Sequence, residues 1–243
     1  MKQHIKLISR IFLIGFLLVT IQVFGQSSEN ISGAWHAKVD DKHTLILIKD
    51  GYFTKTSYEN NKFIKTMGGP YTLSGNGLEI KLEFDSEKSE TVGETVKKTF
   101  SLKDKTLNLS LNKGTETELV AFKQVDNGEA PLAGVWHITD RMQDGKLVPI
   151  QRSGTRKTLK ILTGDRFQWF AIDPGTKGFM GTGGGSYTFE NGKYTENIEF
   201  FSRDDSRVGA KLSFDGDLKE GKWHHSGLSS KGDKIYEVWS KVK

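Results

Sequence analysis

Apolar and polar residues alternate along most of the chain with a period of two, which is typical of half-buried β-strands. Residues 78–84 read Leu-Glu-Ile-Lys-Leu-Glu-Phe, and residues 107–112 read Leu-Asn-Leu-Ser-Leu-Asn. Turn pairs such as Asp50-Gly51 and Asn191-Gly192 separate such stretches. No segment has the 3.6-residue period of an amphipathic helix. The pattern predicts an all-β protein built from many short strands.

The chain contains an internal repeat. Residues 31–36, Ile-Ser-Gly-Ala-Trp-His, match residues 132–137, Leu-Ala-Gly-Val-Trp-His, at an offset of 101. The offset is 114 between Phe53 and Phe167, and it reaches 117 in the last strand. Offsets that grow in steps are what a duplication followed by loop insertions leaves behind. The largest step, 13 residues, falls between His137 and Thr158.

Each copy, of about 100 residues, is long enough to fold around one small core. Eight antiparallel strands joined by short turns form a barrel or a sandwich, and closure into a barrel removes exposed strand edges. We therefore expect two tandem antiparallel β-barrels of about eight strands each, over residues 26–127 and 128–243. The short polar stretch Asp126–Pro131 should keep the two barrels close together.

The first 25 residues have the composition of a secretory signal peptide. Three positive side chains, Lys2, Lys6 and Arg10, precede an apolar run of about 13 residues that ends at Val23. This run is shorter than the roughly 20 residues of a membrane-spanning helix, so we expect cleavage after Gly25. The sequence thus predicts an exported protein, periplasmic or secreted, whose mature chain does not span a membrane.

Composition narrows the range of partners. The formal net charge is +5, and removing the three leader charges reduces it to +2. No basic cluster with interleaved aromatic residues remains, so nucleic acid is not an expected partner. The chain has no Cys, which excludes disulfides and thiolate chemistry. The run Gly181–Ser186 lacks the Lys and the helix of a phosphate-binding loop, so we expect a turn or strand bulge there and no cofactor.

Both copies open with Gly-X-Trp, at Gly33–Trp35 and at Gly134–Trp136. This triplet resembles the opening signature of lipocalins and their relatives, in which the Trp sits at the closed end of a β-barrel. The second copy is similar to an uncharacterised family of secreted, lipocalin-like bacterial domains of the calycin type, through residues 183–188, 194–196 and 237–239. The resemblance covers most of residues 132–243. It implies a barrel and points to a ligand, without an established activity.

The repeat also predicts which side chains point into the second barrel. Glu196 aligns with Ile80, and His225 aligns with Leu109, both of which are expected inside the first barrel. An unpaired buried charge costs several kcal/mol, so two such replacements predict a polar cluster. Glu237, on the last strand, is a third candidate. We expect apolar walls around this cluster from four aromatic side chains, Tyr194, Phe200, Trp136 and Trp223.

The favoured function is therefore non-catalytic binding of a small, partly apolar ligand in the second barrel. A Glu–His pair that only fixes the strand register is the purely structural alternative. The same pair could instead act as the acid and base of an enzyme. A zinc site formed by Glu196, His225 and Glu237 is chemically possible but has no spacing signature, so we expect no metal.

A further alternative is an interaction module with filled barrels, which would act through its surface on an envelope protein or a glycan. The consecutive aromatics Trp169 and Phe170 favour it, because one of the two should face outward. His36 and His137 follow the signature Trp residues and are expected on the surface. The sequence leaves the oligomeric state open.

Overall fold

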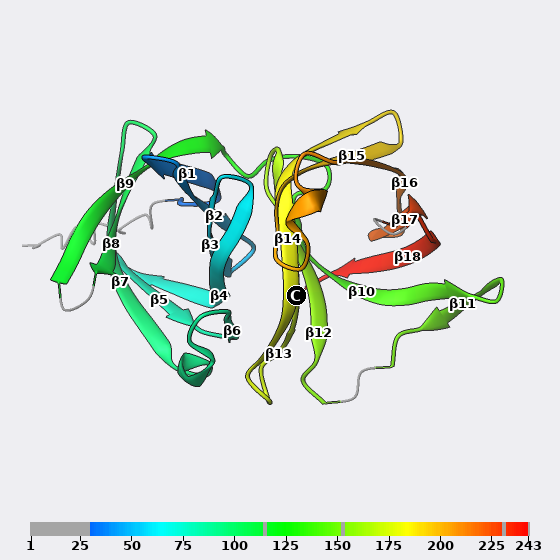
Figure 1. Cartoon of the computed structure of the whole chain (residues 1–243), viewed down its shortest axis with the longest axis horizontal. Coiled ribbons are helices and arrows are strands. Elements are labelled where there is room, and N and C mark those ends of the chain that lie inside the picture. Colours follow the sequence, from blue (N-terminus) through cyan, green and yellow to red (C-terminus); the bar gives the residue numbers. More distant parts are fainter. Residues whose placement is uncertain (1–29, 114–115, 152–153, 230–231, 243) are drawn as a thin grey trace, which may run out of the picture.

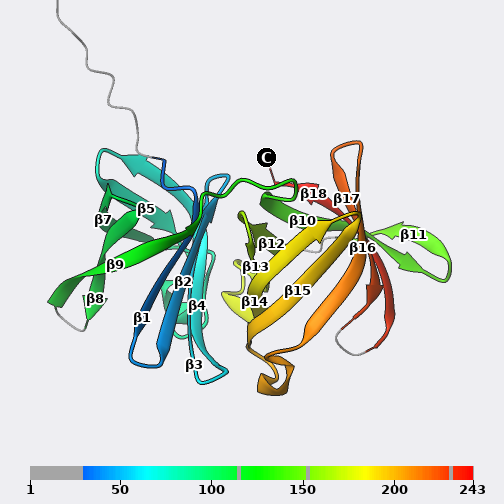
Figure 2. The same ribbon diagram turned by 90° about the horizontal axis from the view of Figure 1, so that it is seen from above.

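The computed structural model describes residues 30–242, apart from residues 114–115, 152–153 and 230–231. The predicted signal peptide, residues 1–25, lies outside the described residues. The described chain forms two closed antiparallel β-barrels that lie side by side (Figure 1, Figure 2). The prediction of an all-β protein with two tandem barrels is confirmed.

The first barrel contains the strands of the first repeat. These are β1 (Gly33–Val39), β2 (Lys42–Lys49), β3 (Tyr52–Glu59), β4 (Lys62–Ser74), β5 (Gly77–Lys81), β6 (Phe84–Asp85), β7 (Thr95–Lys103), β8 (Thr106–Lys113) and β9 (Glu116–Asp126). Eight strands follow the order β3-β2-β1-β9-β8-β7-β5-β4, and pairing of β3 with β4 closes the barrel. The short strand β6 lies beside β4.

The second barrel repeats this arrangement and adds one hairpin. Its strands are β10 (Gly134–Gln143), β11 (Lys146–Pro149), β12 (Lys157–Leu162), β13 (Arg166–Asp173), β14 (Gly178–Glu190), β15 (Lys193–Phe201), β16 (Lys211–Lys219), β17 (Lys222–Leu228) and β18 (Lys234–Lys241). Pairing of β10 with β18 closes the barrel. Strand β11 pairs only with the end of β10, and this hairpin projects on the side away from the first barrel (Figure 1). It accounts for the inserted residues between His137 and Thr158.

The two short 3-10 helices confirm the repeat. One spans Ser89–Thr91 and the other Asp205–Arg207, at the predicted offset of 116 residues. Each follows the strand segment that ends at Phe84–Asp85 or Phe201. Among the described residues, no helix has the length and hydropathy that crossing a membrane requires.

The Gly-X-Trp triplets build the same corner in both barrels. The indole Nε1 of Trp35 donates a hydrogen bond to the carbonyl oxygen of Ile31 over 2.9 Å, and Trp136 bonds Leu132 over 2.9 Å. Gly33 has a φ of 122°, and a Cβ there would lie 2.3 Å from the carbonyl oxygen of Asp126. Only glycine permits this backbone conformation and this close approach. The triplet therefore fixes how the first strand enters each barrel.

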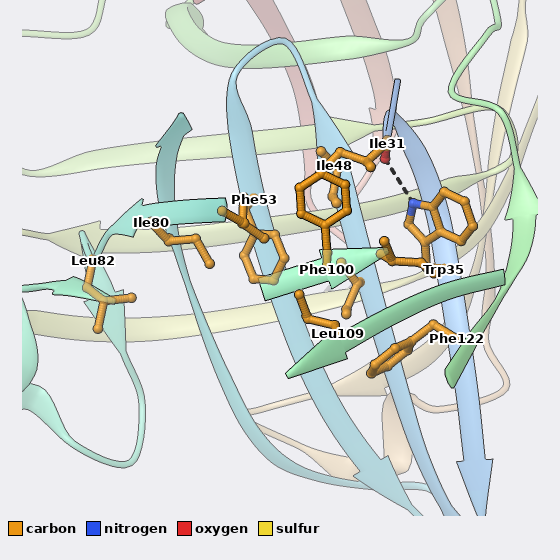
Figure 3. Packing of buried hydrophobic residues seen from close by; sticks show 12 residues of the cluster. Ile31, Trp35, Ile48, Phe53, Ile80, Leu82, Phe100, Leu109 and Phe122 are labelled. Carbon is orange, nitrogen blue, oxygen red and sulfur yellow. Dashed lines mark hydrogen bonds between the residues drawn. The ribbon is translucent and has the colours of Figure 1, made fainter. Parts of the chain in front are cut away.

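The interior of the first barrel is apolar. Trp35, Phe53, Phe100 and Phe122 point toward one another in a buried cluster that is completed by aliphatic side chains (Figure 3). Ile80 and Leu109, which were used to predict the inward face, belong to this cluster. The strand phase of the first copy is therefore the expected one over these positions.

A bulge in β15 reverses the strand phase near its end. Gly185 pairs with Ile198 and Gly184 pairs with Phe200, so Glu199 is an extra residue. Because neighbouring residues of a strand face opposite sides, the extra residue turns Phe200 out of the barrel. A Cβ on Gly185 would lie 2.0 Å from the carbonyl oxygen of Asn197. Glycine thus allows the bulge: the run Gly181–Ser186, where a turn or bulge is predicted, forms part of β14 and lies opposite the bulged residue of β15.

The two barrels pack against each other through the same face. A buried cluster between them takes six residues from each barrel, and five of its pairs are equivalent in the repeat: Ala34/Val135, Leu45/Leu159, Leu47/Ile161, Tyr58/Ile172 and Phe84/Phe200. At its centre, Nε2 of Gln168 donates to Thr66 and to Thr182, each over 3.0 Å. These two threonines are themselves equivalent in the repeat. The contact therefore resembles the interface of a two-fold symmetric dimer.

Candidate functional site

Six of the seven predicted ligand-binding residues lie in or beside the interior of the second barrel. Glu196 and His225 are buried, with exposed fractions of 4% and 3%, and the side chain of Glu237 is 12% exposed. The aromatic residues Trp136, Tyr194 and Trp223 are buried in the same interior.

Phe200 is the exception. It lies in the cluster between the barrels, with its ring centroid 5.2 Å from that of Tyr58. The expectation that Phe200 lines the interior is therefore wrong, and its cause is the bulge at Glu199, which reverses the direction of the next side chain.

A buried lysine that sequence analysis missed pairs with Glu196. Lys160, on β12, is 5% exposed, and its Nζ donates a hydrogen bond to Oε1 of Glu196 over 2.8 Å. The hydroxyl of Tyr194 donates to the same oxygen over 3.0 Å. Four ring centroids lie 5.1–5.8 Å from Nζ, those of Phe167, Tyr194, Trp223 and Trp239. The carboxylate and the ring faces together compensate the burial of the ammonium group.

The repeat alignment contains a signal for Lys160. At the offset of 114 it replaces Ile46, which is fully buried inside the first barrel. The interior of the second barrel therefore holds three ionisable residues where the first has two isoleucines and a leucine.

His225 lies between this ion pair and Glu237. Its Nδ1 is 3.8 Å from Oε2 of Glu237, which is longer than a hydrogen bond. Burial lowers the pKa of His225, and Lys160 acts in the same direction, while Glu237 opposes the change. The imidazole is therefore neutral near pH 7.

Glu237 connects His225 with the end of the barrel. It accepts a hydrogen bond from Nη2 of Arg141 over 3.0 Å. Burial by itself would raise the pKa of Glu237, but His225, Lys160 and Arg141 together lower it. The carboxylate is therefore ionised at neutral pH. It lies between His225 in the interior and Arg141 at the surface.

Several buried nitrogens in this interior make no hydrogen bond to any described residue. They are Nε1 of Trp223, Nε1 of Trp239 and both ring nitrogens of His225. An unsatisfied buried polar group costs about 1–3 kcal/mol, and native interiors leave few of them. Among the described residues, two further atoms of this kind lie outside that interior: Oγ1 of Thr54 on β3 and Nε of Arg166 on β13. Unsatisfied groups thus concentrate inside the second barrel, where a bound polar molecule would find partners.

Strand β10 leads from Trp136 to the other end of the barrel, where a surface cleft of about 540 Å³ opens. Ile138 and Ile150 belong both to the cleft lining and to the packing of the interior. The charged residues that the structure places along the cleft are all basic: Arg141, Arg156 and Lys157. The cleft therefore offers an apolar floor and a basic rim, in which Arg141 is paired with Glu237, Lys157 is paired with Glu83, and Arg156 is the third cation.

Glu196 is engaged by Lys160 and Tyr194, and His225 lies beyond hydrogen-bond distance of Glu237, so these groups do not form a proton relay. Among the described residues, no cluster of three or more His, Asp or Glu side chains could hold a metal ion.

Two surface predictions need correction. His36 points out of its barrel, but it is half-buried against the second barrel and hydrogen-bonds His43 over 3.0 Å. Phe170 also faces outward, yet it is fully buried between the barrels, with its ring centroid 4.8 Å from that of Phe84. The neighbouring barrel, which sequence patterning does not locate, covers both residues.

Neither known protein families nor characterised protein sequences match this chain in comparison.

Proposed function

We propose that this is an exported, non-catalytic binding protein whose second barrel takes a small, partly apolar acid through its open end. The apolar part of the ligand lies over Ile138 and Ile150. Its acidic group faces the basic rim, and a polar atom reaches toward His225. The first barrel then serves as a packed support, because its interior is filled by apolar side chains.

One observation carries this proposal. The basic cleft shares Ile138 and Ile150 with the packing of the interior that holds unsatisfied polar nitrogens at Trp223, Trp239 and His225. Ligand pockets are mostly apolar with a few fixed polar groups, and they occur at the mouths of β-barrels. The resemblance of the second copy to secreted lipocalin-like domains agrees with such a role.

The second candidate is an interaction module with filled barrels. It is favoured by the position of Lys160, whose side chain occupies the centre of the second barrel. It is also favoured by the projecting hairpin, on which Met142, Leu147 and Val148 are 39%, 46% and 37% exposed. Exposed apolar side chains on a protruding hairpin are common at protein–protein contacts.

Titration with decanoate and with decanol separates the two candidates. We expect decanoate to bind and decanol to bind more weakly, because only the acid uses the basic rim. Arg156→Gln should weaken decanoate binding about three- to tenfold, as loss of one exposed charge contact predicts. Isothermal titration calorimetry of the mature protein provides the affinities.

The repeat supplies a matched control. Lys42 is the equivalent of Arg156 at the offset of 114, and Lys42→Gln should leave decanoate binding unchanged. Equal affinity for decanoate and decanol would contradict the proposal, as would an Arg156→Gln protein that binds decanoate like the wild type. Absence of binding to either compound would favour the interaction module.

A further inference from the structure

The repeat relates two opposite edges of the contact between the barrels, and these edges differ. One of them has a cleft of about 610 Å³. It lies between β1, β2 and β3 of the first barrel and β13 and β15 of the second. Apolar side chains from both barrels line its depth: Leu45, Val125, Ile198 and Val208. Polar groups surround them. It lies apart from the open end of the second barrel, with no lining residue in common.

A connected set of side chains holds the polar wall of this cleft. Nε2 of His36 and Nδ1 of His43 are 3.0 Å apart, so one ring donates to the other. The ring of His43 stacks on Tyr58 at 5.1 Å and 14°. Tyr58 donates to Oε2 of Glu199 over 3.0 Å, and Arg166 bonds the other carboxylate oxygen. Both oxygens of Glu199 are therefore engaged, while the second ring nitrogen of each histidine makes no hydrogen bond to a described residue.

The equivalent place on the other side of the interface is less than half as large. There Lys157 replaces His43 and donates from Nζ to Oε1 of Glu83 over 2.7 Å. Tyr52, the equivalent of Arg166, donates to Oε2 of Glu83 over 2.6 Å. The remaining space is about 250 Å³. A lysine that bridges the barrels thus narrows one side, and a shorter histidine leaves the other side wider.

The charges of the open cleft balance. Its lining contains two cations, Lys38 and Arg166, and two carboxylates, Asp41 and Glu199. Burial lowers the pKa of His36, and His43 and Arg166 lower it further, so His36 is neutral near pH 7. A balanced lining gives no net attraction to an ion. It presents imidazole and amide groups that both donate and accept hydrogen bonds, and this combination matches hydroxyl groups.

We propose that the cleft between the barrels is a second ligand site, which binds a neutral, hydroxyl-rich molecule of mono- or disaccharide size. The free nitrogens of His36 and His43 and the amide of Asn61 contact hydroxyl groups, and the apolar depth receives the carbon skeleton. Asn61, at the turn between β3 and β4, has a φ of 63° and stands on the rim. The volume of the cleft lies within the range of small-molecule sites.

Saccharide binding to the mature protein tests this site. The probes are glucose, galactose, maltose, cellobiose and N-acetylglucosamine, with glucuronate and glucosamine as charged comparisons. Saturation-transfer NMR measures binding at pH 7.5, and chemical shifts of the His36 and His43 rings report the location. We expect a neutral saccharide to bind, to shift both rings, and to bind more tightly than either charged sugar.

His43→Lys copies the closed side of the interface. The new lysine reaches Glu199 as Lys157 reaches Glu83, so saccharide binding should weaken at least about tenfold. The reciprocal Lys157→His should leave this binding unchanged. Asn61→Gly, which keeps the turn because glycine accepts a positive φ, should weaken binding independently of the histidine.

Three results would overturn the site: no neutral saccharide shifts the two histidine rings, a charged sugar binds more tightly, or His43→Lys binds like the wild type. Decanoate binding by His43→Lys should equal that of the wild type. Failure of the saccharide site therefore remains distinguishable from failure of the site in the second barrel.

Discussion

The interiors of the two barrels differ at positions that the repeat makes equivalent. The first barrel has Ile46, Ile80 and Leu109, and it closes around an apolar core. The second has Lys160, Glu196 and His225 at these positions, and it closes in the same way. These three ionisable side chains are therefore not needed for closure of the barrel. Replacing a buried ion pair with apolar residues is often neutral or stabilising, so the ion pair is not required for stability, which supports the ligand site proposed for the second interior.

The largest expected effect comes from separating the ion pair. Glu196→Ile leaves the Lys160 ammonium buried without a counterion, which should lower the free energy of unfolding by about 3–5 kcal/mol. The double change Lys160→Ile with Glu196→Ile places at both positions the isoleucines found in the first barrel. It should return the free energy of unfolding to within about 1 kcal/mol of the wild-type value. Guanidinium denaturation followed by tryptophan fluorescence measures both. A double variant as unstable as the single one would show that the two interiors are not interchangeable.

The tryptophan of the Gly-X-Trp triplet is common to both barrels, so its replacement should reduce stability equally in both. Trp35→Phe and Trp136→Phe each remove an indole hydrogen bond to a buried carbonyl group. We expect each change to cost about 1–3 kcal/mol, with the two values close to each other. Denaturation curves of the two variants provide the comparison. A large loss at one tryptophan and none at the other would mean that the two signature corners have different structural roles.

The smallest expected effect is a pH dependence of the free energy of unfolding that arises in the interior of the second barrel. Because the folded chain disfavours protonation of His225, the unfolded chain binds more protons below pH 6.5, and stability falls as the pH decreases. The loss is limited to about 1.4 kcal/mol per pH unit. His225→Leu, which copies Leu109, should lose less stability between pH 7.5 and 5.5 than the wild type. His36 contributes in the same direction in both proteins and cancels in the difference.

An equal loss of stability in the wild type and in His225→Leu would remove His225 from this pH dependence. Glu237 does not disturb the measurement. Its pKa lies below the ordinary value of 4.5, so its contribution is lost only in more acidic solution.

The strands and the repeat were predictable because alternation fixes the strand phase wherever one face meets solvent. Lys160 was missed for the opposite reason. Its equivalent strand β2 is buried on both faces over residues 45–48, since the other barrel covers the outside. Alternation disappears there, so the inward positions cannot be read from the pattern. The prediction that Phe200 faces the interior was wrong because one bulged residue reverses the strand phase. Single-residue bulges leave no clear signal in the spacing of apolar residues.

The contact between the barrels was also beyond the reach of sequence patterning. His36, Phe170 and Gln168 all face out of their own barrels, and only the neighbouring barrel buries them. A repeat indicates that the two units have equivalent surfaces, but it does not indicate that these surfaces pack against each other.

The most direct test of ligand binding in the second barrel is a titration followed through the tryptophan indole groups. The chain has five tryptophans, and their indole N–H signals are resolvable in a ¹⁵N-labelled sample. The indoles of Trp35 and Trp136 already donate to carbonyl oxygens, whereas those of Trp223 and Trp239 donate to no described residue. On addition of decanoate, the signals of Trp223 and Trp239 should shift and that of Trp35 should stay in place. Unchanged signals for Trp223 and Trp239, or an equal shift of Trp35, would contradict a ligand site in the second barrel.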